Sequence, residues 1–387
     1  MSTLGGPRIV TSGLIYASDA ADPLSFRGEP TTNLMPTITS WSSYVTAPTN
    51  QTVYDFPGSI GSPKTVKQSI GSSVVGGGGN YGGFFRSGVS SVVVSGETVT
   101  VSFWVRSLSG NMTCALSNQS GAGDQSNISF AFTATSEWKR ISNTATLNLS
   151  KDQFYIWNSS VASGRWQIAD FQLEKKSYAT TYTEGTRGTT VATGGGLADI
   201  TGNGINGTLV NNPRESAERS GCIVFDGTDD YISLPSVVLG NTFTLSSFVR
   251  INTTAVEGCI YGSDANGVDN WFSINGDKVY LLATQSADVN NTAIIGTTSM
   301  STSRWYHAAA TVNTNTMKVY LNGVEEATLT AAFNFGAWNS TGAIGRRGSV
   351  SQRYFNGSIA SIQMFNRVLS IAEIRSLYSS MRGRFGA

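Results

Sequence analysis

The stretch that most constrains this chain runs from residue 221 to residue 235. Two short apolar runs, residues 223–225 and 231–234, flank a cluster of turn-forming residues at 226–230, which reads Asp-Gly-Thr-Asp-Asp. Glycine adopts positive φ without steric cost, and aspartate side chains accept hydrogen bonds from nearby backbone N–H groups. The pattern therefore predicts two strands joined by a tight reversal.

The same segment resembles a known family. Phe-Asp-Gly-Thr-Asp-Asp-Tyr-Ile, at residues 225–232, is similar to the entry of the laminin-G-like, concanavalin-like jelly rolls that are common in bacterial surface and phage proteins. Residues 6–26 resemble the opening strand of these jelly rolls. The Asp-Leu-Ser-Gly-Asn-Gly segment that normally follows has its counterpart only at residues 199–204, Asp-Ile-Thr-Gly-Asn-Gly. The resemblance covers residues 6–26 and 197–378 and implies one sandwich interrupted by an insertion, which exposed loops tolerate.

Residues 31–185 form the predicted inserted domain. Apolar residues alternate with other side chains over residues 98–106, which predicts a strand, and further strands are expected at residues 91–94, 137–141, 154–157 and 166–173. The end of the block carries Gln-Leu-Glu and then Ser-Tyr-Ala-Thr-Thr-Tyr. This ending is similar to that of a recurrent phage module, which itself resembles carbohydrate-binding jelly rolls.

The C-terminal part reads as strands joined by short turns and followed by one helix. Asn322-Gly323 is the strongest short hairpin signal in the chain. Ser370 and Glu373 have capping-box spacing, and the apolar face of the helix that follows is predicted to hold Ile371, Ile374, Leu377 and Tyr378.

The predicted fold class is all-β, with two jelly-roll β-sandwich domains, one inserted into the other, and one short C-terminal helix. Residues 1–30 are assigned to an N-terminal arm and the first strand of the C-terminal sandwich. Residues 31–185 are assigned to the inserted carbohydrate-binding-like sandwich, 186–196 to a glycine-rich linker, and 197–387 to the laminin-G-like sandwich.

The composition excludes some classes of function. Charged residues are 13% of the chain, and the formal net charge is +1. A nearly neutral surface without basic runs argues against nucleic acid or a membrane as a partner. No apolar run reaches transmembrane length, and residues 1–12 lack the apolar core of a signal peptide. The cysteines Cys114, Cys222 and Cys259 lack metal-ligand spacing and are expected to be buried, with a Cys222–Cys259 bridge left open.

The residues do not favour catalysis. The single histidine, His307, lies in a predicted strand without a recognisable nucleophile motif, and the resemblance implies a packed or edge position for it. Retaining glycosidases need two carboxylates close together on one face, whereas Glu325 and Glu326 are adjacent and should point to opposite faces of a strand. We therefore predict that the protein is not an enzyme and that it has no cofactor other than a possible Ca²⁺.

Two oxygen-rich loops are candidate calcium sites. One loop holds Asp226, Asp229 and Asp230, and the other holds Asp264 and Asp269 beside two asparagines. Laminin-G-like sandwiches often bind Ca²⁺ on a rim loop, and carboxylate and amide oxygens suit this hard cation. The alternative is that these residues serve only the backbone of their turns, because aspartate and asparagine dominate turns for that reason.

Three tryptophans are candidates for binding a glycan, because an aromatic ring stacks on the apolar face of a sugar. Trp104 falls on the strand face opposite Phe103, whereas Trp271 and Trp338 lie near strand or loop ends. The alternative for each is a place in the core or in an interface.

Three functions compete. The resemblance favours a structural protein of tailed phages, particularly marine or cyanobacterial ones, that decorates the capsid or forms a fibre or tail appendage. The lack of a recognisable signal peptide is consistent with this function, because phage proteins leave the host by lysis. A free glycan-binding lectin or adhesin is the second, and a polysaccharide-degrading enzyme the third. Expected partners are the chain itself, with a trimer as the expected oligomer, other virion proteins such as capsid or tail, and a host surface glycan. Residues 1–7 and 379–387 are the expected attachment points, because nothing evident in the sequence covers them.

Overall fold

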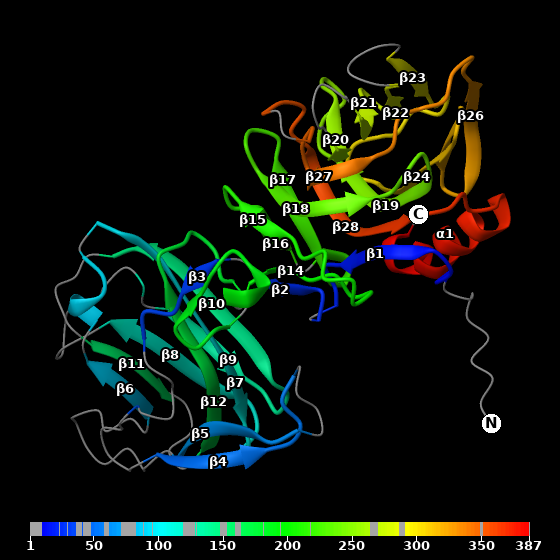
Figure 1. Ribbon diagram of the computed structural model, residues 1–387. Coiled ribbons are helices and arrows are strands. Elements are labelled where there is room, and N and C mark those ends of the chain that lie inside the picture. Colours follow the sequence, from blue (N-terminus) through cyan, green and yellow to red (C-terminus); the bar gives the residue numbers. More distant parts are fainter. Residues whose placement is uncertain are drawn as a thin grey trace, which may run out of the picture. The chain divides into compact units, whose positions relative to one another are not determined.

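The computed structural model describes residues 10–386 apart from residues 23, 29, 36–40, 42–47, 58–61, 71–82, 88, 95, 119–127, 129, 148–152, 159–163, 181, 194, 217, 264–269, 286–290 and 349–350. The chain divides into two compact units. Unit 1 comprises Met1–Pro30 and Arg187–Ala387, and unit 2 comprises Thr31–Thr186. Unit 2 is therefore an insertion into the chain of unit 1 (Figure 1).

Unit 1 is a sandwich of two antiparallel sheets. The order of the 8-stranded sheet is β16 (Arg214–Ser216), β17 (Cys222–Asp226), β28 (Asn356–Phe365), β19 (Thr242–Ile251), β24 (Trp305–Asn313), β25 (Thr316–Leu321) and β26 (Val324–Thr330), with β1 (Leu14–Asp19) also paired to β28. The order of the 7-stranded sheet is β15 (Thr208–Val210), β18 (Tyr231–Val238), β27 (Asn339–Ile344), β20 (Gly258–Ser263), β21 (Trp271–Asn275), β22 (Lys278–Ala283) and β23 (Thr292–Ile295). The short strands β2 (Phe26–Gly28) and β14 (Gly196–Leu197) pair separately, and 3₁₀ turns lie at Val191–Thr193 and Glu218–Ser220.

The N-terminal strand completes the large sheet of unit 1. Strand β1 pairs with the C-terminal half of β28, from Leu14 opposite Phe365 to Asp19 opposite Ser361. Strand β17 pairs with the N-terminal half of the same strand, ending with Asp226 opposite Asn356. Figure 1 shows β1, in blue, alongside the orange-red β28. Two segments that lie far apart in the chain thus share one edge of one strand.

The core of unit 1 lies between its two sheets. Alternating residues of β19, β24, β28, β20 and β21 are buried there, and the largest fully buried side chains include Phe225, Phe243, Tyr261 and Trp338. Each large apolar side chain of this kind stabilises the fold by roughly 1.5–3 kcal/mol. The hairpin between β25 and β26 turns at Asn322 and Gly323, which have φ values of 50° and 77°, as a type I′ turn requires.

Unit 2 is a second antiparallel sandwich. Its 5-stranded sheet has the order β10 (Lys139–Thr146), β7 (Thr98–Ser107), β12 (Arg165–Glu174), β5 (Lys64–Ile70) and β4 (Thr49–Val53). Its 4-stranded sheet has the order β6 (Gly83–Ser87), β11 (Gln153–Asn158), β8 (Met112–Asn118) and β9 (Phe130–Ala134), and β3 (Thr31–Thr32) pairs with β13 (Thr186–Arg187). Phe103, Phe154, Trp166 and Phe171 lie in the core between the sheets.

The predicted fold class is confirmed, with two all-β sandwiches and one helix, α1 (Ile371–Phe385), at the C-terminal end of the described residues. One predicted strand, at residues 91–94, is wrong, because the chain forms a 3₁₀ turn at Val89–Ser91 and then leaves regular structure. All three cysteines are free, buried thiols, as expected, and the Cys222–Cys259 bridge that the sequence left open is not formed. No helix in the described part of the chain combines the length and hydropathy needed to cross a bilayer.

Helix α1 covers the outer face of the large sheet of unit 1. Ser370 and Glu373 form the predicted capping box, and the Arg367 guanidinium lowers the pKa of Glu373 to about 2. Ile374 and Leu377 pack against Ala309 and Tyr320, whereas Ile371, predicted on the same face, is exposed. The helix is therefore a part of the sandwich and not an appendage.

The expectation that nothing in the chain covers residues 379–387 is wrong for Arg384 and Phe385. Phe385 is 1% exposed and stacks on Phe248 with the ring centroids 4.6 Å apart. Arg384 donates from Nη1 to both carboxylate oxygens of Asp19 at 2.7 Å, and its other nitrogens donate to the backbone oxygens of Arg219 and Gly221. The end of the helix is thereby fastened to β1 and to the turn before β17. The other expected attachment segment, residues 1–7, lies outside the described residues.

Replacement of Arg384 by alanine tests how much this fastening contributes. The change leaves the Asp19 carboxylate and two backbone oxygens without their partner, so the free energy of unfolding of unit 1 should fall by about 2 kcal/mol, which corresponds to about 6 °C in melting temperature. The exposed Arg382 in the same turn provides the matched control variant, Arg382→Ala. Equal melting temperatures for the two variants, measured by calorimetry, would show that Arg384 contributes nothing particular.

Candidate functional site

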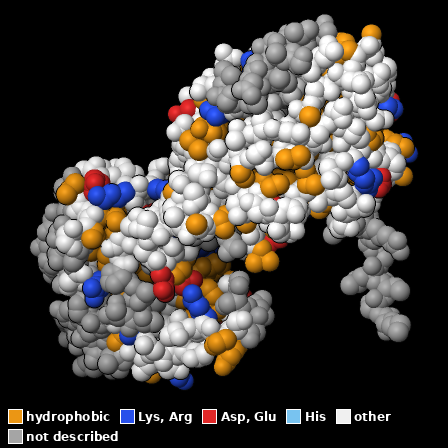
Figure 2. All heavy atoms as spheres, in the orientation of Figure 1, with side chains coloured by type: hydrophobic (Ala, Val, Ile, Leu, Met, Phe, Trp, Pro, Cys, Tyr) orange, Lys and Arg blue, Asp and Glu red, His pale blue; other side chains and the backbone are white. Residues whose placement is uncertain are grey.

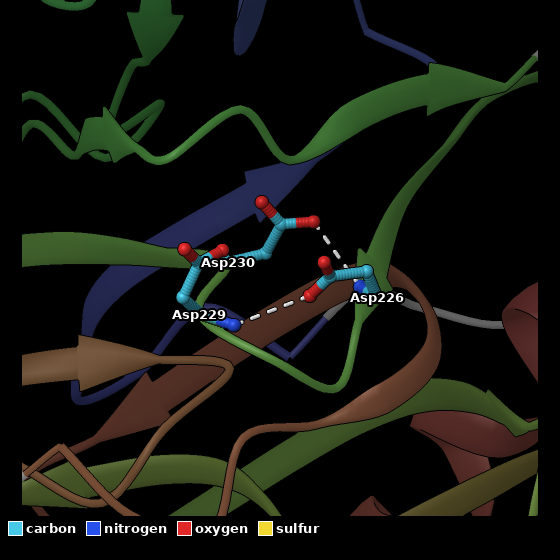
Figure 3. A group of neighbouring side chains, drawn as sticks. All are labelled: Asp226, Asp229 and Asp230. Carbon is cyan, nitrogen blue, oxygen red and sulfur yellow. Dashed lines mark hydrogen bonds between the residues drawn. The ribbon is translucent and has the colours of Figure 1, made fainter.

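The turn between β17 and β18 brings together three carboxylates. Atoms of Asp226, Asp229 and Asp230 that could each bind a metal ion lie within 4.8 Å of one another. Asp226 Oδ1 accepts hydrogen bonds from the backbone N–H groups of Thr228 at 2.7 Å and Asp229 at 3.3 Å. Asp230 Oδ2 accepts one from the backbone N–H of Asp226 at 3.1 Å (Figure 3). The aspartates therefore form the turn and at the same time gather negative charge on it.

The negative charges of these three carboxylates repel one another when no cation is bound. Asp226 and Asp229 are exposed, but Asp230 is buried. Burial, together with the nearby charge of Asp226, raises the pKa of Asp230 to about 6. A divalent cation would remove this repulsion, and the donors are the hard oxygen anions that Ca²⁺ prefers. The residues present thus fit a calcium ion, which Asp226, Asp229 and Asp230 would hold on the rim of unit 1.

Only part of the second predicted calcium loop lies within the described residues. Asp264 and Asp269 lie outside the described residues. Their neighbour Asn270 is 1% exposed, and its Oδ1 accepts a hydrogen bond from the backbone N–H of Thr284 at 3.0 Å. Asn270 therefore fixes the backbone at Thr284, which agrees with the alternative that the residues of this loop serve the backbone.

Two of the three predicted glycan-binding tryptophans cannot stack on a sugar. Trp338 is 0% exposed and lies in the core of unit 1, with its ring centroid 4.7 Å from that of Phe243. Trp271 is 3% exposed, because the guanidinium groups of Arg347 and Arg353 lie over its ring at 4.7 and 4.5 Å from the centroid. These assignments are wrong because a strand end near the surface can still be covered by residues from distant loops.

Trp104 has a different environment. It lies on the outer face of the five-stranded sheet of unit 2, since its neighbours Phe103 and Val105 point into the core. It is partly buried beside Phe56, whose ring centroid is 5.7 Å away, and Phe56 also contacts Trp138 at 5.1 Å. We call Phe56, Trp104 and Trp138, with the charged residues around them, the aromatic face.

Charged side chains frame the aromatic face. The guanidinium of Arg106 lies 4.7 Å from the centroid of the Trp138 ring, pairs with Asp55, and donates from Nε to Gln167 at 2.8 Å. Lys64 Nζ lies over the Phe56 ring, 5.2 Å from its centroid, and pairs with Asp170 at 2.6 Å. Rings and hydrogen-bonding groups therefore lie next to one another on this sheet face. Alternation with Phe103 singles out Trp104 in the sequence, but nothing in the sequence pairs it with Trp138 and Phe56, which come together with it only through tertiary packing.

The residues considered for catalysis serve structural roles. His307 is completely buried, and its Nε2 lies 2.8 Å from Ser246 Oγ. Burial lowers the pKa of His307 to about 3, so it stays neutral. Glu325 pairs with Lys318, whereas Glu326 accepts hydrogen bonds from Thr297 and Thr298, so the two carboxylates have separate partners.

Comparison with known proteins agrees with this architecture. The family model of the concanavalin A-like lectin/glucanases superfamily, of the laminin G type, matches residues 226–375. This segment is a concanavalin A-like jelly-roll domain. It begins at Asp226 of the acidic turn and ends inside helix α1, so the candidate calcium site lies at its entry. No curated protein matches the chain.

Several solved structures match part of the chain. The binding domain of Paraclostridial Mosquitocidal Protein 1 shares 16% identity at a TM-score of 0.40, and that of botulinum neurotoxin serotype D shares 17% at 0.41; each alignment covers 47% of this chain. The chain spans about half the length of these two domains, 49% and 48%. Domain 4 of the GH43 extracellular arabinanase AbnA from Geobacillus stearothermophilus, in complex with arabinotriose, shares 24% identity at a TM-score of 0.39, over 47% of this chain and 93% of that one. These neighbours are mostly binding domains rather than catalytic ones.

The raised pKa of Asp230 predicts how stability depends on pH. Because this pKa is higher in the folded chain than in the unfolded chain, the folded state holds the proton more tightly, and the free energy of unfolding should fall as the pH rises from about 4 to about 6. Asp230→Asn removes the charge but keeps an oxygen that can accept the Asp226 N–H. The variant should melt above the wild type at pH 7.5 and together with it at pH 4. The exposed Asp229→Asn serves as the control and should show a smaller gain; a variant that melts below the wild type at pH 7.5 contradicts the prediction.

Calcium should act on the same charge. At pH 7.5 we expect Ca²⁺ to raise the melting temperature of the wild type beyond the effect of Na⁺ at equal ionic strength, and to raise that of Asp230→Asn less. The chain should remain folded after chelation, because the sandwich core does not depend on the ion. Calorimetry with calcium chloride and with a chelator makes both measurements. If Ca²⁺ has no effect while the pH dependence is present, the three aspartates form a turn and nothing more.

Proposed function

We propose that this protein is a non-catalytic glycan-binding protein. The observation that carries the proposal is the partly buried Trp104 on the aromatic face of unit 2. A saccharide ring presents C–H groups on its faces and hydroxyl groups at its edge. A site for it therefore needs a flat apolar surface bordered by hydrogen-bonding groups, and the aromatic face supplies both.

The geometry of the aromatic face favours a neutral or weakly polar saccharide. Two cations of this face, Arg106 and Lys64, are each paired with a carboxylate, Asp55 and Asp170 respectively. A third, Arg140, lies opposite Trp104 on β10 and donates to Ser102 Oγ and to the Thr180 oxygen. Paired charges can donate to and accept from hydroxyl groups without leaving a net charge that demands a counter-ion. The rings are also held in place before a ligand arrives, because Phe56 is 4% exposed and packs edge-on against both tryptophans. Little ordering entropy then has to be lost on binding.

The proposal that the protein does not catalyse a reaction rests on its carboxylates. Retaining glycosidases place two carboxyl groups about 5–5.5 Å apart, one of them kept protonated. Asp226, Asp229 and Asp230 form one group of carboxylates in the described part of the chain, and Asp226 and Asp230 accept backbone hydrogen bonds in the turn. This engagement supports a structural or metal-binding role for them.

We further propose that the protein acts as a component of a phage particle, on the capsid surface or in a fibre or tail appendage. The support is the likeness of residues 6–26, 166–182 and 225–232 to phage modules. In such a place the protein is made in the host cytoplasm, associates with itself and with capsid or tail proteins, and presents its sheet faces to a host glycan. The visible face carries charged side chains singly or in small groups, so association would depend on apolar area and backbone pairing (Figure 2). Mass spectrometry of purified particles tests this proposal, and absence of the protein from them contradicts it.

Glycan binding is tested with two tryptophan variants. Trp104→Ala should weaken binding to the best ligand of an array of neutral saccharides by about tenfold or more, since an aromatic ring at the centre of a site carries much of the affinity. Trp157 of β11 lies on the outer face of the other sheet of unit 2, because Phe154 and Ile156 point into the core, and Trp157→Ala is the matched control. Calorimetric melting confirms that both variants are folded. The proposal fails if the wild type binds no saccharide or if the two variants bind alike.

A further inference from the structure

Strand β12 of unit 2 is irregular at Asp170, beside the aromatic face. The register of β12 on β7 shifts between Ala169, which lies opposite Trp104, and Gln172. The backbone of Asp170 has a φ of 51°, in the left-handed region. A residue of this conformation at a register shift forms a β-bulge of the kind in which glycine is usual. Such bulges change the direction of a side chain and are frequent next to functional sites.

The carboxylate of Asp170 lies at the border of the aromatic face. Its Oδ1 is 2.6 Å from Lys64 Nζ, and this nitrogen is 5.2 Å from the centroid of the Phe56 ring. The same nitrogen is 5.4 Å from the centroid of the Tyr182 ring. Phe56 belongs to the aromatic face, where its ring contacts that of Trp104. Two rings and an ion pair therefore hold the Asp170 carboxylate and the Lys64 ammonium group side by side in advance of any ligand.

An aspartate at this position lowers the stability of the fold in two ways. Glycine reaches the left-handed region without strain, whereas aspartate does so at some cost, although it tolerates the region better than most residues. The Asp170 side chain is also only 11% exposed, and burial raises the pKa of its carboxyl although Lys64 acts in the opposite direction. The charged carboxylate is thus less favourable in the folded chain than in water. Strained residues that their surroundings hold in place are concentrated at binding and catalytic sites.

A donor and an acceptor that are fixed side by side match the edge of a sugar ring. Two adjacent hydroxyl groups in a gauche arrangement have oxygens at a spacing similar to that of Lys64 Nζ and Asp170 Oδ1. One hydroxyl group can donate to the carboxylate while its neighbour accepts from the ammonium group. Hydrogen bonds to charged groups are roughly twice as strong as those between neutral groups. They also discriminate strongly between ligands that have the hydroxyl group in the required position and ligands that do not.

We infer that Asp170, together with Lys64, binds two adjacent hydroxyl groups of the saccharide and determines which saccharides the aromatic face accepts. The inference rests on the proposed glycan binding and adds the chemical class of the ligand, a saccharide with an unsubstituted pair of neighbouring hydroxyl groups. Trp104 then supplies affinity for the face of any sugar ring, whereas Asp170 selects among sugars. Replacement of the two residues should therefore have different effects.

The experiment uses the full chain with four soluble probes, cellohexaose, xylohexaose, mannohexaose and maltohexaose, which differ in their hydroxyl groups or in their linkages. Calorimetric titration gives the affinities, and the preference is the ratio of the affinities for the strongest and the weakest probe. Asp170→Gly should lower the affinity for the strongest probe by about tenfold or more and should reduce the preference. Trp104→Ala should lower the affinity for all four probes and keep the preference within about twofold of the wild type.

Two further variants provide the controls. Asp170→Asn keeps the shape of the side chain and one carbonyl acceptor but loses the charge, so its affinity should fall between those of Asp170→Gly and the wild type. Glu97→Gln removes the carboxylate that pairs with Lys175 at 2.8 Å, next to the start of β7, and should bind within about twofold of the wild type. Asp170→Gly should not melt below the wild type, because glycine relieves the left-handed backbone.

The outcomes distinguish this inference from the proposed function. If Trp104→Ala weakens binding but Asp170→Gly binds and discriminates like the wild type, glycan binding stands and the inference is overturned. If the wild type binds none of the four probes, the inference is overturned, and the proposed function fails as well only when the whole saccharide array is unbound. A loss of affinity in Glu97→Gln equal to that in Asp170→Gly also contradicts the inference. If Asp170→Gly melts below the wild type, Asp170→Asn decides, and unchanged affinity in that variant overturns the inference.

Discussion

The pairing of β1 with β28 is the constraint on which unit 1 depends. Strand β28 is a central strand of the large sheet, and one of its edges is shared by β17 and by the N-terminal strand. Without β1, the backbone groups of residues 361–365 would face solvent on that edge, beside apolar side chains of the core. The sandwich of unit 1 is therefore complete only when segments from both sides of the insertion pair with each other.

Several contacts secure this return. The Asp199 carboxylate accepts from the backbone N–H of Ala17, and Asn203 Nδ2 donates to the Ile15 oxygen at 2.9 Å, which joins the first strand to the segment that follows the insertion. At the other end of the chain, Arg384 binds the Asp19 carboxylate. Strand β1 is thus held by its sheet neighbour, by the returning chain and by helix α1. An insertion of a whole domain is compatible with a stable sandwich because these contacts do not pass through the inserted residues.

Each of the two sandwiches leaves its rims and outer faces available for recognition. The acidic turn lies in a short connection and is held by backbone hydrogen bonds, whereas the aromatic face is held by close packing on the sheet beneath it. The two differ in charge: the turn is negative, and the ion pairs of the aromatic face are balanced. A chain that is nearly neutral overall can in this way present separate surfaces to different partners.

The sequence by itself determined the local features whose physical cause lies within a few residues. The alternation around Phe103, the type I′ turn at Asn322 and the capping box at Ser370 follow from strand periodicity, from the φ values that glycine and asparagine tolerate, and from unsatisfied N–H groups at a helix start. Likeness to a family pattern split between residues 6–26 and 199–204 also revealed the insertion. What only the tertiary structure decided is which outward residues become covered. Trp338 and Phe385 are buried and Trp271 lies beneath two arginines because elements distant in the chain pack over them, and strand periodicity names two faces without saying what covers either.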